Sequence, residues 1–194
     1  MSNLLSFLWS SKGEVTSKKI DTNFTVSVAE SVTAGALANT LCAEPGASTY
    51  FKGGIVAYSI ASKKEILGID IVYAEKNNFA NPFTTLEMAK AVVKLYNSRI
   101  GISTTGYSLP TSRPENKELG QCALDIKNPY AYICLYDSLM DEEIIKKVEF
   151  NYDEKSSTLI QRATVQAKVA LEGKNMYVEY TKKMSNLEGS FVLS

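Results

Sequence analysis

Three side chains in the first third of the chain carry functional groups that could act together in nucleophilic catalysis. Ser48 offers a hydroxyl, Tyr58 a phenol and Lys63 an amine. The chain has no histidine, so a serine nucleophile would need another base to remove its proton. A lysine can be that base when burial or a nearby cation lowers its pKa, as in Ser–Lys hydrolases. These residue types suit a hydrolase in which Lys63 activates Ser48, while Tyr58 relays a proton or orients the lysine.

The same three residues also have ordinary structural explanations. Ser48 follows a Pro-Gly-Ala sequence and suits a turn, Tyr58 suits a half-buried strand, and Lys63 suits a solvated helix. Ser48 and Lys63 are fifteen residues apart, unlike the S-x-x-K spacing that places both groups on one helical turn. They could still meet if the turn around Ser48 and the helix after Tyr58 lie at one edge of a sheet. On spacing alone, the structural explanation is favoured.

A second group of polar residues follows the first expected strand. Glu30 comes directly after an alternating, β-branched segment at 24–29, and Ser31 and Thr33 lie at the start of an expected helix. A carboxylate at a strand end is often a ligand group, but Glu30 could equally be a charge in the first turn of that helix. Residues 31–35 resemble a weak helix-start anion site.

The order of elements that must position these residues predicts an α/β fold. Apolar patterns favour strands at 24–29, 54–58, 100–105, 130–136 and 143–150, and helices from about 33, at 59–67, 84–96 and 159–171. This order predicts a three-layer α/β/α sandwich with a mixed, mostly parallel sheet. Ligands bind at strand carboxyl ends in such sheets, so Glu30, Tyr58 and Thr105 should share a rim with the loop after Gly106.

Length and composition predict one domain. The 194 residues divide into an N-terminal helix and linker (1–23), the main domain (24–172) and a segment at 173–194 that is either part of it or a tail. Hydrophobic residues make up 45% and charged residues 22%, as in soluble globular proteins. The chain is therefore expected to be cytoplasmic, without a membrane association.

The charge balance and the residue types argue against several functions. Lys and Arg number 21, as do Asp and Glu, so the chain lacks the basic surface expected for nucleic-acid binding. Three cysteines without C-x-x-C spacing, and no histidine, make a structural zinc site unfavourable. The sequence therefore predicts no metal, no cofactor and no nucleic-acid partner.

Several motifs resemble the CinA C-terminal domain family, the nicotinamide-nucleotide amidases. These motifs are VAESVTAG from Val28, PGASTYFKGGIVAYSIASKKEILG from Pro45, and a strand that ends in Thr105-Gly106. The resemblance covers about residues 24–170. It implies hydrolysis of a linear amide, with nicotinamide mononucleotide or a related pyridine nucleotide giving the nicotinic acid form and ammonia. It also implies an α/β/α fold that forms a homo-oligomer, a dimer or larger.

Roles carried over from the resemblance fall on the residues discussed above. Ser48 takes the position of the nucleophile, Lys63 that of the general base and Tyr58 that of the supporting tyrosine. The resemblance further places a group of residues in the substrate pocket: Glu30, Ser31, Thr33, Thr105 and Gly106.

The sequence departs from the family pattern where the substrate would be recognised. The T-G-x-x-G-P loop has become Gly106-Tyr-Ser-Leu-Pro110 with extra residues after it. The D-R pair before the last helix is Asp153-Glu154, and Arg162 replaces the missing cation in part. These changes predict an altered substrate preference. They also leave an alternative, an altered or inactive member that acts as a nucleotide-binding or interaction protein.

Overall fold

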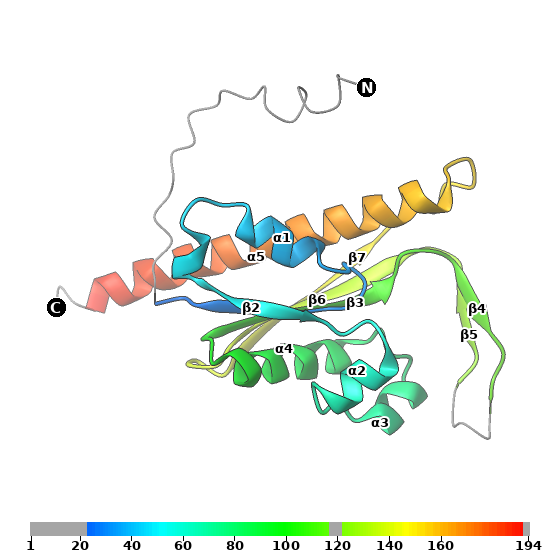
Figure 1. Cartoon of the computed structure of the whole chain (residues 1–194), viewed down its shortest axis with the longest axis horizontal. Helices are drawn as coiled ribbons and strands as arrows, with labels where there is room; N and C mark the ends of the chain where they lie inside the picture. The colour runs from blue at the N-terminus through cyan, green and yellow to red at the C-terminus, as the bar shows by residue number, and fades with distance from the viewer. Residues whose placement is uncertain (1–22, 117–121, 192–194) are drawn as a thin grey trace.

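A mixed five-stranded sheet forms the centre of the molecule (Figure 1). This computed structural model describes residues 23–116 and 122–191. The strand order is β2-β1-β3-β6-β7, in which β2, β1 and β3 run parallel, and β6 and β7 are antiparallel to their neighbours. The bounds are β1 (Val26–Glu30), β2 (Phe51–Val56), β3 (Ile100–Tyr107), β6 (Tyr130–Asp137) and β7 (Glu142–Glu149). Two short strands, β4 (Thr111–Arg113) and β5 (Leu124–Ile126), form a separate ribbon.

Helices cover both faces of the sheet, which confirms the predicted three-layer α/β/α sandwich with a mixed sheet. Figure 1 shows two helices on one face, α1 (Ala36–Cys42) and α5 (Thr158–Phe191). On the other face lie α2 (Ile60–Glu65), α3 (Ile71–Lys76) and α4 (Pro82–Tyr96). A short 3₁₀ turn, η1 (Ala47–Thr49), precedes β2.

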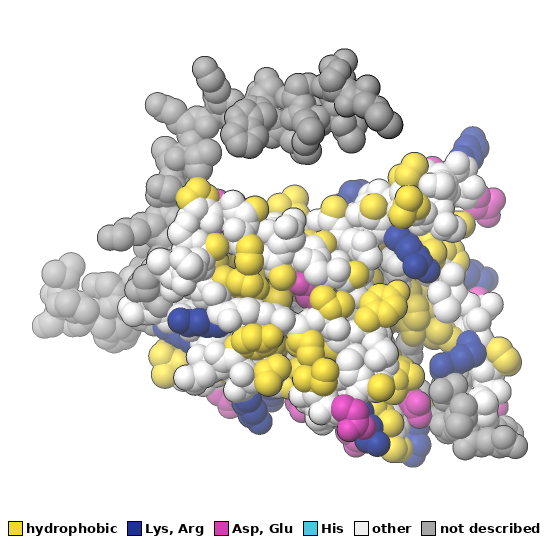
Figure 2. Space-filling model, in the orientation of Figure 1, with side chains coloured by type: hydrophobic (Ala, Val, Ile, Leu, Met, Phe, Trp, Pro, Cys, Tyr) yellow, Lys and Arg dark blue, Asp and Glu magenta, His cyan; other side chains and the backbone are white. Residues whose placement is uncertain are grey.

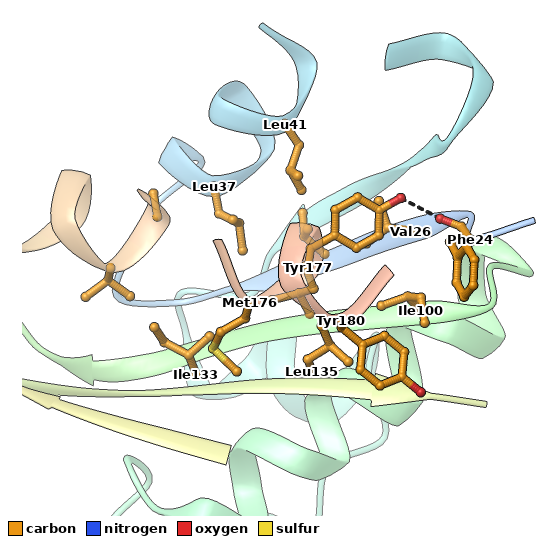
Figure 3. Close-up of a cluster of buried hydrophobic side chains, with 14 of the residues drawn as sticks. Phe24, Val26, Leu37, Leu41, Ile100, Ile133, Leu135, Met176, Tyr177 and Tyr180 are labelled. Carbon is orange, nitrogen blue, oxygen red and sulfur yellow. Dashed lines mark hydrogen bonds between the residues drawn. The ribbon is translucent and has the colours of Figure 1, made fainter. Parts of the chain in front are cut away.

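The main hydrophobic core lies between the sheet and the α1–α5 layer (Figure 3). All five residues of β1 are buried, as expected for a central strand covered on both faces. Leu37 and Leu41 of α1 pack there with Tyr177 of α5. The Tyr177 hydroxyl donates to the carbonyl of Phe24 at 2.5 Å, so the ring is buried without an unsatisfied polar group.

The last helix is longer than its sequence pattern predicted. We expected it to end at 171, whereas α5 continues to Phe191. Buried Met176, Tyr177, Tyr180 and Met184 follow a helical spacing, so the segment after 172 forms part of the domain core. Gly173 disguised this continuity because glycine weakens a helix prediction. A Cβ at Gly173 would lie 3.2 Å from Leu37 Cδ1, so the glycine permits close packing of α5 on α1.

Two further elements were missing from the sequence prediction. Helix α3 is capped at its N-terminus by Asp70, whose carboxylate accepts the N–H groups of Val72 and Tyr73 at 2.9 and 3.1 Å. The segment at 107–128, expected to be irregular, contains the β4–β5 ribbon. The expected N-terminal helix lies outside the described residues.

Candidate active site

A pocket of about 250 Å³ opens at the carboxyl ends of the parallel strands, where the sequence predicted a ligand site. Its walls come from the segment after β1, helix α2, the end of β3, the loop before α4 and the start of α5. The lining residues that concern the chemistry are Ser31, Tyr58, Lys63, Thr105, Gly106 and Arg162.

Lys63 lines this pocket and is only 5% exposed. Its helix α2 is fixed at the N-terminus by a reciprocal cap, in which Ser59 Oγ accepts the N–H of Ser62 and Ser62 Oγ accepts the N–H of Ser59. The Lys63 amine donates to the carbonyls of Ala57 at 2.7 Å and Tyr58 at 3.4 Å. The cap and these carbonyls together hold the amine in one place.

The environment of Lys63 favours a neutral amine more than water does. Burial lowers the pKa of this lysine from its ordinary value of 10.5 to about 8. The hydrogen-bond partners of Nζ are all neutral oxygens, so they do not offset the desolvation of a positive charge with an opposite charge. A lysine in such a setting can accept a proton near physiological pH.

Ser31 is the hydroxyl that meets the Lys63 amine. Its Oγ lies 3.0 Å from Lys63 Nζ, although 32 residues separate the two in the chain. The N–H of Ser31 donates to the carbonyl of Thr104 at 2.9 Å, which fixes the backbone just after β1. A hydroxyl within hydrogen-bond distance of a poised base is the arrangement expected of an activated nucleophile. The sequence placed Ser31 in the pocket but assigned it a binding role.

Ser48 does not meet Lys63 within one chain, contrary to the expectation that the two share an edge of the sheet. Ser48 lies in the exposed turn η1 before β2, whereas Lys63 follows β2. The six residues of β2 span about 20 Å at about 3.3 Å per residue. The carbonyl of Tyr50, next to this turn, accepts the N–H of Val26 at the start of β1, the end opposite Ser31. The structure therefore pairs Lys63 with Ser31 and not with the Ser48 of the same chain.

Glu30 and Thr33 are fully engaged in the interior and do not line the pocket. Both oxygens of the buried Glu30 carboxylate accept backbone N–H groups, from Gly35 at 2.8 Å, Leu37 at 3.1 Å and Ala38 at 2.7 Å. Thr33 Oγ1 lies 2.6 Å from Thr104 Oγ1. These contacts hold the segment that leads into α1, so the two residues support Ser31 from behind. Neither residue lines the pocket in this structure, and the substrate-binding role of both remains a prediction.

The remaining predicted residues line the pocket. Tyr58 is 62% exposed, and its ring stands at the pocket wall. Thr105 Oγ1 lies 2.9 Å from Thr85 Oγ1 of α4. A Cβ at Gly106 would come within 2.3 Å of the Tyr130 carbonyl, so a side chain there would displace β3 from β6.

The loop after Gly106, which the sequence placed at this rim, forms one wall of the pocket. Tyr107, Ser108, Leu109 and Thr111 line the pocket in the altered loop. The Tyr107 hydroxyl donates to Asn78 Oδ1 at 2.5 Å, which joins this wall to the loop before α4. Burial raises the pKa of Tyr107 to about 12, so its hydroxyl stays protonated at neutral pH. No sequence pattern links Asn78 to Tyr107, because the contact depends on how the loops pack.

Arg162 contributes a guanidinium to the pocket from the first turns of α5. It lies far along the chain from the other lining residues, and the sequence had suggested it only as a partial replacement for a lost cation. Among the described residues there is no cluster of three or more His, Cys, Asp or Glu side chains that could hold a metal ion. In the same parts of the chain, no helix is both long and apolar enough to cross a bilayer.

Sequence comparison now identifies the family. The family model described as "CinA C-terminal domain" matches residues 10–171, so the chain belongs to the CinA C-terminal domain family. A CinA-like protein of Fervidobacterium nodosum is 33% identical over 129 residues, covering 66% of this chain and 32% of the relative. A putative competence-damage inducible protein of Clostridium perfringens is 35% identical over 147 residues, covering 73% of this chain and 32% of the relative. The chain thus spans about a third of the length of these curated relatives.

Solved structures support the same fold. Competence damage-inducible protein A of Klebsiella pneumoniae matches with a TM-score of 0.63 and 22% identity, over 86% of this chain and 89% of that one. A CinA superfamily protein from Enterobacter cloacae matches with a TM-score of 0.59 and 22% identity, and the match covers 81% of this chain and 85% of that one. At this identity the likeness concerns the fold alone.

Proposed function

We propose that this chain is an amidohydrolase that converts nicotinamide mononucleotide, or a related pyridine nucleotide, to its nicotinic acid form and ammonia. The observation that carries this proposal is the 3.0 Å contact between Ser31 Oγ and the amine of the buried Lys63, both of which line an open pocket. Ser31 takes the role of nucleophile that the sequence pattern had given to Ser48. Lys63 keeps its role as general base.

The reaction begins with the neutral Lys63 amine, which removes the proton of Ser31 Oγ as the oxygen attacks the carboxamide carbon. The C–N bond then breaks, and the proton held by Lys63 passes to the leaving nitrogen, which departs as ammonia. Lys63 next deprotonates a water molecule that attacks the acyl-serine ester. The Ser31–carbon bond breaks, the serine regains a proton, and the carboxylic acid leaves. One amide and one water thus give one acid and one ammonia.

The pocket suits a small, singly phosphorylated nucleotide. Its volume of about 250 Å³ is close to the lower limit of typical small-molecule sites, and it is open on one side. Arg162 provides a guanidinium that can pair with a phosphate while the carboxamide lies against Ser31. Tyr58 offers an aromatic face at the wall, where a pyridinium ring could stack.

The experiment is ammonia release from nicotinamide mononucleotide by the purified chain and by matched serine variants. Ser31→Ala should reduce kcat by about 10³-fold or more, since it removes the nucleophile. Ser138→Ala removes an exposed hydroxyl at the other end of the sheet and should leave the rate unchanged. Full activity in Ser31→Ala would overturn the assignment of the nucleophile.

A wild-type chain that releases no ammonia from any pyridine nucleotide carboxamide would refute the proposed activity. Calorimetry then distinguishes the alternative function. Saturable binding of nicotinamide mononucleotide without turnover, weakened by Arg162→Ala, would identify a nucleotide-binding protein built on the same pocket.

A further inference from the structure

One asparagine links two segments that form one side of the pocket. Asn78 lies between α3 and α4, directly before the lining residues Phe79 and Ala80. Its side-chain oxygen accepts the Tyr107 hydroxyl at 2.5 Å, and its side-chain nitrogen donates to the Tyr130 hydroxyl at 2.9 Å. Tyr107 lines the pocket, whereas Asn78 and Tyr130 do not. The lining residues are therefore joined through groups that lie outside the pocket.

The direction of each hydrogen bond in this network is fixed. The Tyr130 hydroxyl lies 3.3 Å from the carbonyl of Ala80, and a carbonyl can only accept, so the tyrosine donates there. The Tyr130 oxygen then accepts from Asn78, which turns the other end of the amide, Oδ1, toward Tyr107. A carboxylate or an apolar side chain of the same size could not supply both the donor and the acceptor.

The backbone at position 78 also suits asparagine. Its φ is +58°, in the left-handed region that asparagine and glycine adopt more readily than other residues. The turn that follows is held by Asn81, whose Nδ2 donates to the Asn78 carbonyl at 2.7 Å. Asn78 thus serves both the turn and the network, and glycine could replace it in the turn but not in the network.

The two tyrosines connect this network to the central sheet. Tyr107 ends β3 and Tyr130 begins β6, and the two lie directly opposite each other in the antiparallel ladder. Their rings meet edge to face with centroids 5.7 Å apart. Figure 2 shows hydrophobic side chains, tyrosines included, on the surface between α2 and the β4–β5 ribbon. The network therefore fixes three segments that are far apart in the chain.

The reacting groups of the proposed reaction lie on other elements. Ser31 follows β1 and Lys63 belongs to α2. The hydrogen bonds of the Lys63 amine go to Ser31, Ala57 and Tyr58, and none of them involves Asn78 or the two tyrosines of the network. Loss of the network should therefore alter how a substrate is held more than how fast it reacts.

We propose that Asn78 is a positioning residue that sets the substrate specificity of the pocket, because it fixes Tyr107 relative to the Phe79–Ala80 segment. Phe79 and Tyr107 both bring aromatic side chains to the pocket. A site of fixed width accepts a flat pyridine ring and disfavours a ring with an added group. This specificity rests on the proposed function, since the pyridine carboxamide is the substrate class named there.

Asn78→Gly tests the network, because glycine keeps the left-handed turn and removes only the amide. The KM for nicotinamide mononucleotide should rise about tenfold, the effect of the lost hydrogen bonds, while kcat stays within about threefold. The preference over an analogue with a methyl group on the pyridine ring, expected to be about tenfold in the wild type, should largely disappear.

Asn97→Gly is the matched control. Asn97 also has a left-handed backbone, with a φ of +48°, and it lies exposed at the end of α4, away from the pocket. This variant should keep the wild-type kcat, KM and substrate preference. An unchanged KM and preference in Asn78→Gly, or a loss confined to kcat, would overturn the proposal.

Hydrogen exchange followed by mass spectrometry gives a readout that does not need turnover. In Asn78→Gly, residues 77–81 and 105–111 should exchange faster than in the wild type, while residues 26–41 should be unchanged. Asn97→Gly should leave all three segments unchanged. Equal protection of the first two segments in the wild type and Asn78→Gly would overturn the positioning role. A wild type without turnover would instead refute the proposed function, and the exchange result would still decide whether Asn78 fixes this side of the pocket.

Discussion

Two buried charged residues lie at opposite ends of the sheet, and their surroundings differ. Asp137 ends β6 beside the start of β3, fully buried, and accepts hydrogen bonds from Arg99 Nε at 3.0 Å and from the Tyr180 hydroxyl at 2.9 Å. Arg99 Nη2 adds an ion pair at 3.0 Å. Lys63, at the pocket end, contacts only neutral oxygens.

The difference separates a structural charge from a reactive one. Asp137 joins the sheet to α5 with its charge compensated by Arg99. Lys63 has burial without an opposite charge, so its pKa falls to about 8 and its positive form is destabilised. A buried charge that no opposite charge compensates lowers the free energy of unfolding. Such destabilising charges, with their shifted pKa values, are common at functional sites. Substitutions of Lys63 should therefore change mainly the catalytic rate, and substitutions of Asp137 should change mainly the stability.

The largest effect should come from Lys63→Ala, measured as the rate of ammonia release from nicotinamide mononucleotide. Loss of the general base should lower kcat by about 10³-fold. Lys63→Arg is the informative control, because a guanidinium stays protonated and cannot accept the serine proton. Retention of more than a tenth of the activity in either variant would show that Lys63 is not the base.

Asp137→Ala should have the opposite profile. It removes the buried carboxylate that Arg99 and Tyr180 contact and should lower the free energy of unfolding by about 3–5 kcal/mol. The kcat of the folded fraction should stay within about twofold of wild type, since the pocket lies at the other end of the sheet. Urea denaturation and steady-state kinetics measure the two quantities. A variant that keeps its stability but loses most of its kcat would contradict a purely structural role for Asp137.

Lys63 should make the stability depend on pH between about 8 and 10.5. Over this range the unfolded lysine holds a proton that the folded one has lost, so stability rises with pH. The difference between the pKa values of the unfolded and folded states corresponds to about 3 kcal/mol in the free energy of unfolding. This contribution to stability is fully present above pH 10.5 and is lost as the pH falls through 8. Lys63→Met should lack this dependence, so its stability advantage over the wild type at pH 7 should shrink toward pH 10. If the free energies of unfolding of the two proteins differ by the same amount at every pH, then burial does not lower the pKa of Lys63.

The smallest effect should come from Tyr180→Phe. This change removes one hydrogen bond to Asp137 and keeps the ring in the core, so the free energy of unfolding should fall by about 1–2 kcal/mol. Burial and the contact with Asp137 both raise the pKa of Tyr180, which keeps it a donor at all moderate pH values. Thermal melts at pH 7 measure the loss, which should disappear in an Asp137→Ala background.

The sequence predicted the layers and the pocket edge because both follow from local patterns. Alternating and continuous apolar segments marked β1, β3 and the β6–β7 hairpin, and the parallel order placed their carboxyl ends together. The structure brings Lys63 to Ser31 and not to the predicted Ser48, and the sequence held a usable signal for this separation. Ser48 precedes the expected strand at 54–58 and Lys63 follows it, and a strand separates its two ends by its full length.

Other features depend on contacts that no local pattern encodes. The Asn78–Tyr107 hydrogen bond and the inclusion of Arg162 in the pocket depend on packing between segments far apart in the chain. Glu30 was interpreted as a ligand because its sequence position is typical of one. The fold instead directs its carboxylate to three backbone N–H groups behind the pocket.

Helix α2 has a consequence for how the site responds to heat. It has six residues, most of them exposed, and a helix this short has little stability of its own. The Ser59–Ser62 cap, the hydrogen bond from Lys63 Nζ to the Ala57 carbonyl and the burial of Leu67 hold it in place. Local opening of such a segment requires less free energy than global unfolding and would withdraw the amine from Ser31. We expect thermal inactivation to begin below the melting temperature of the whole domain, and to be reversible on cooling.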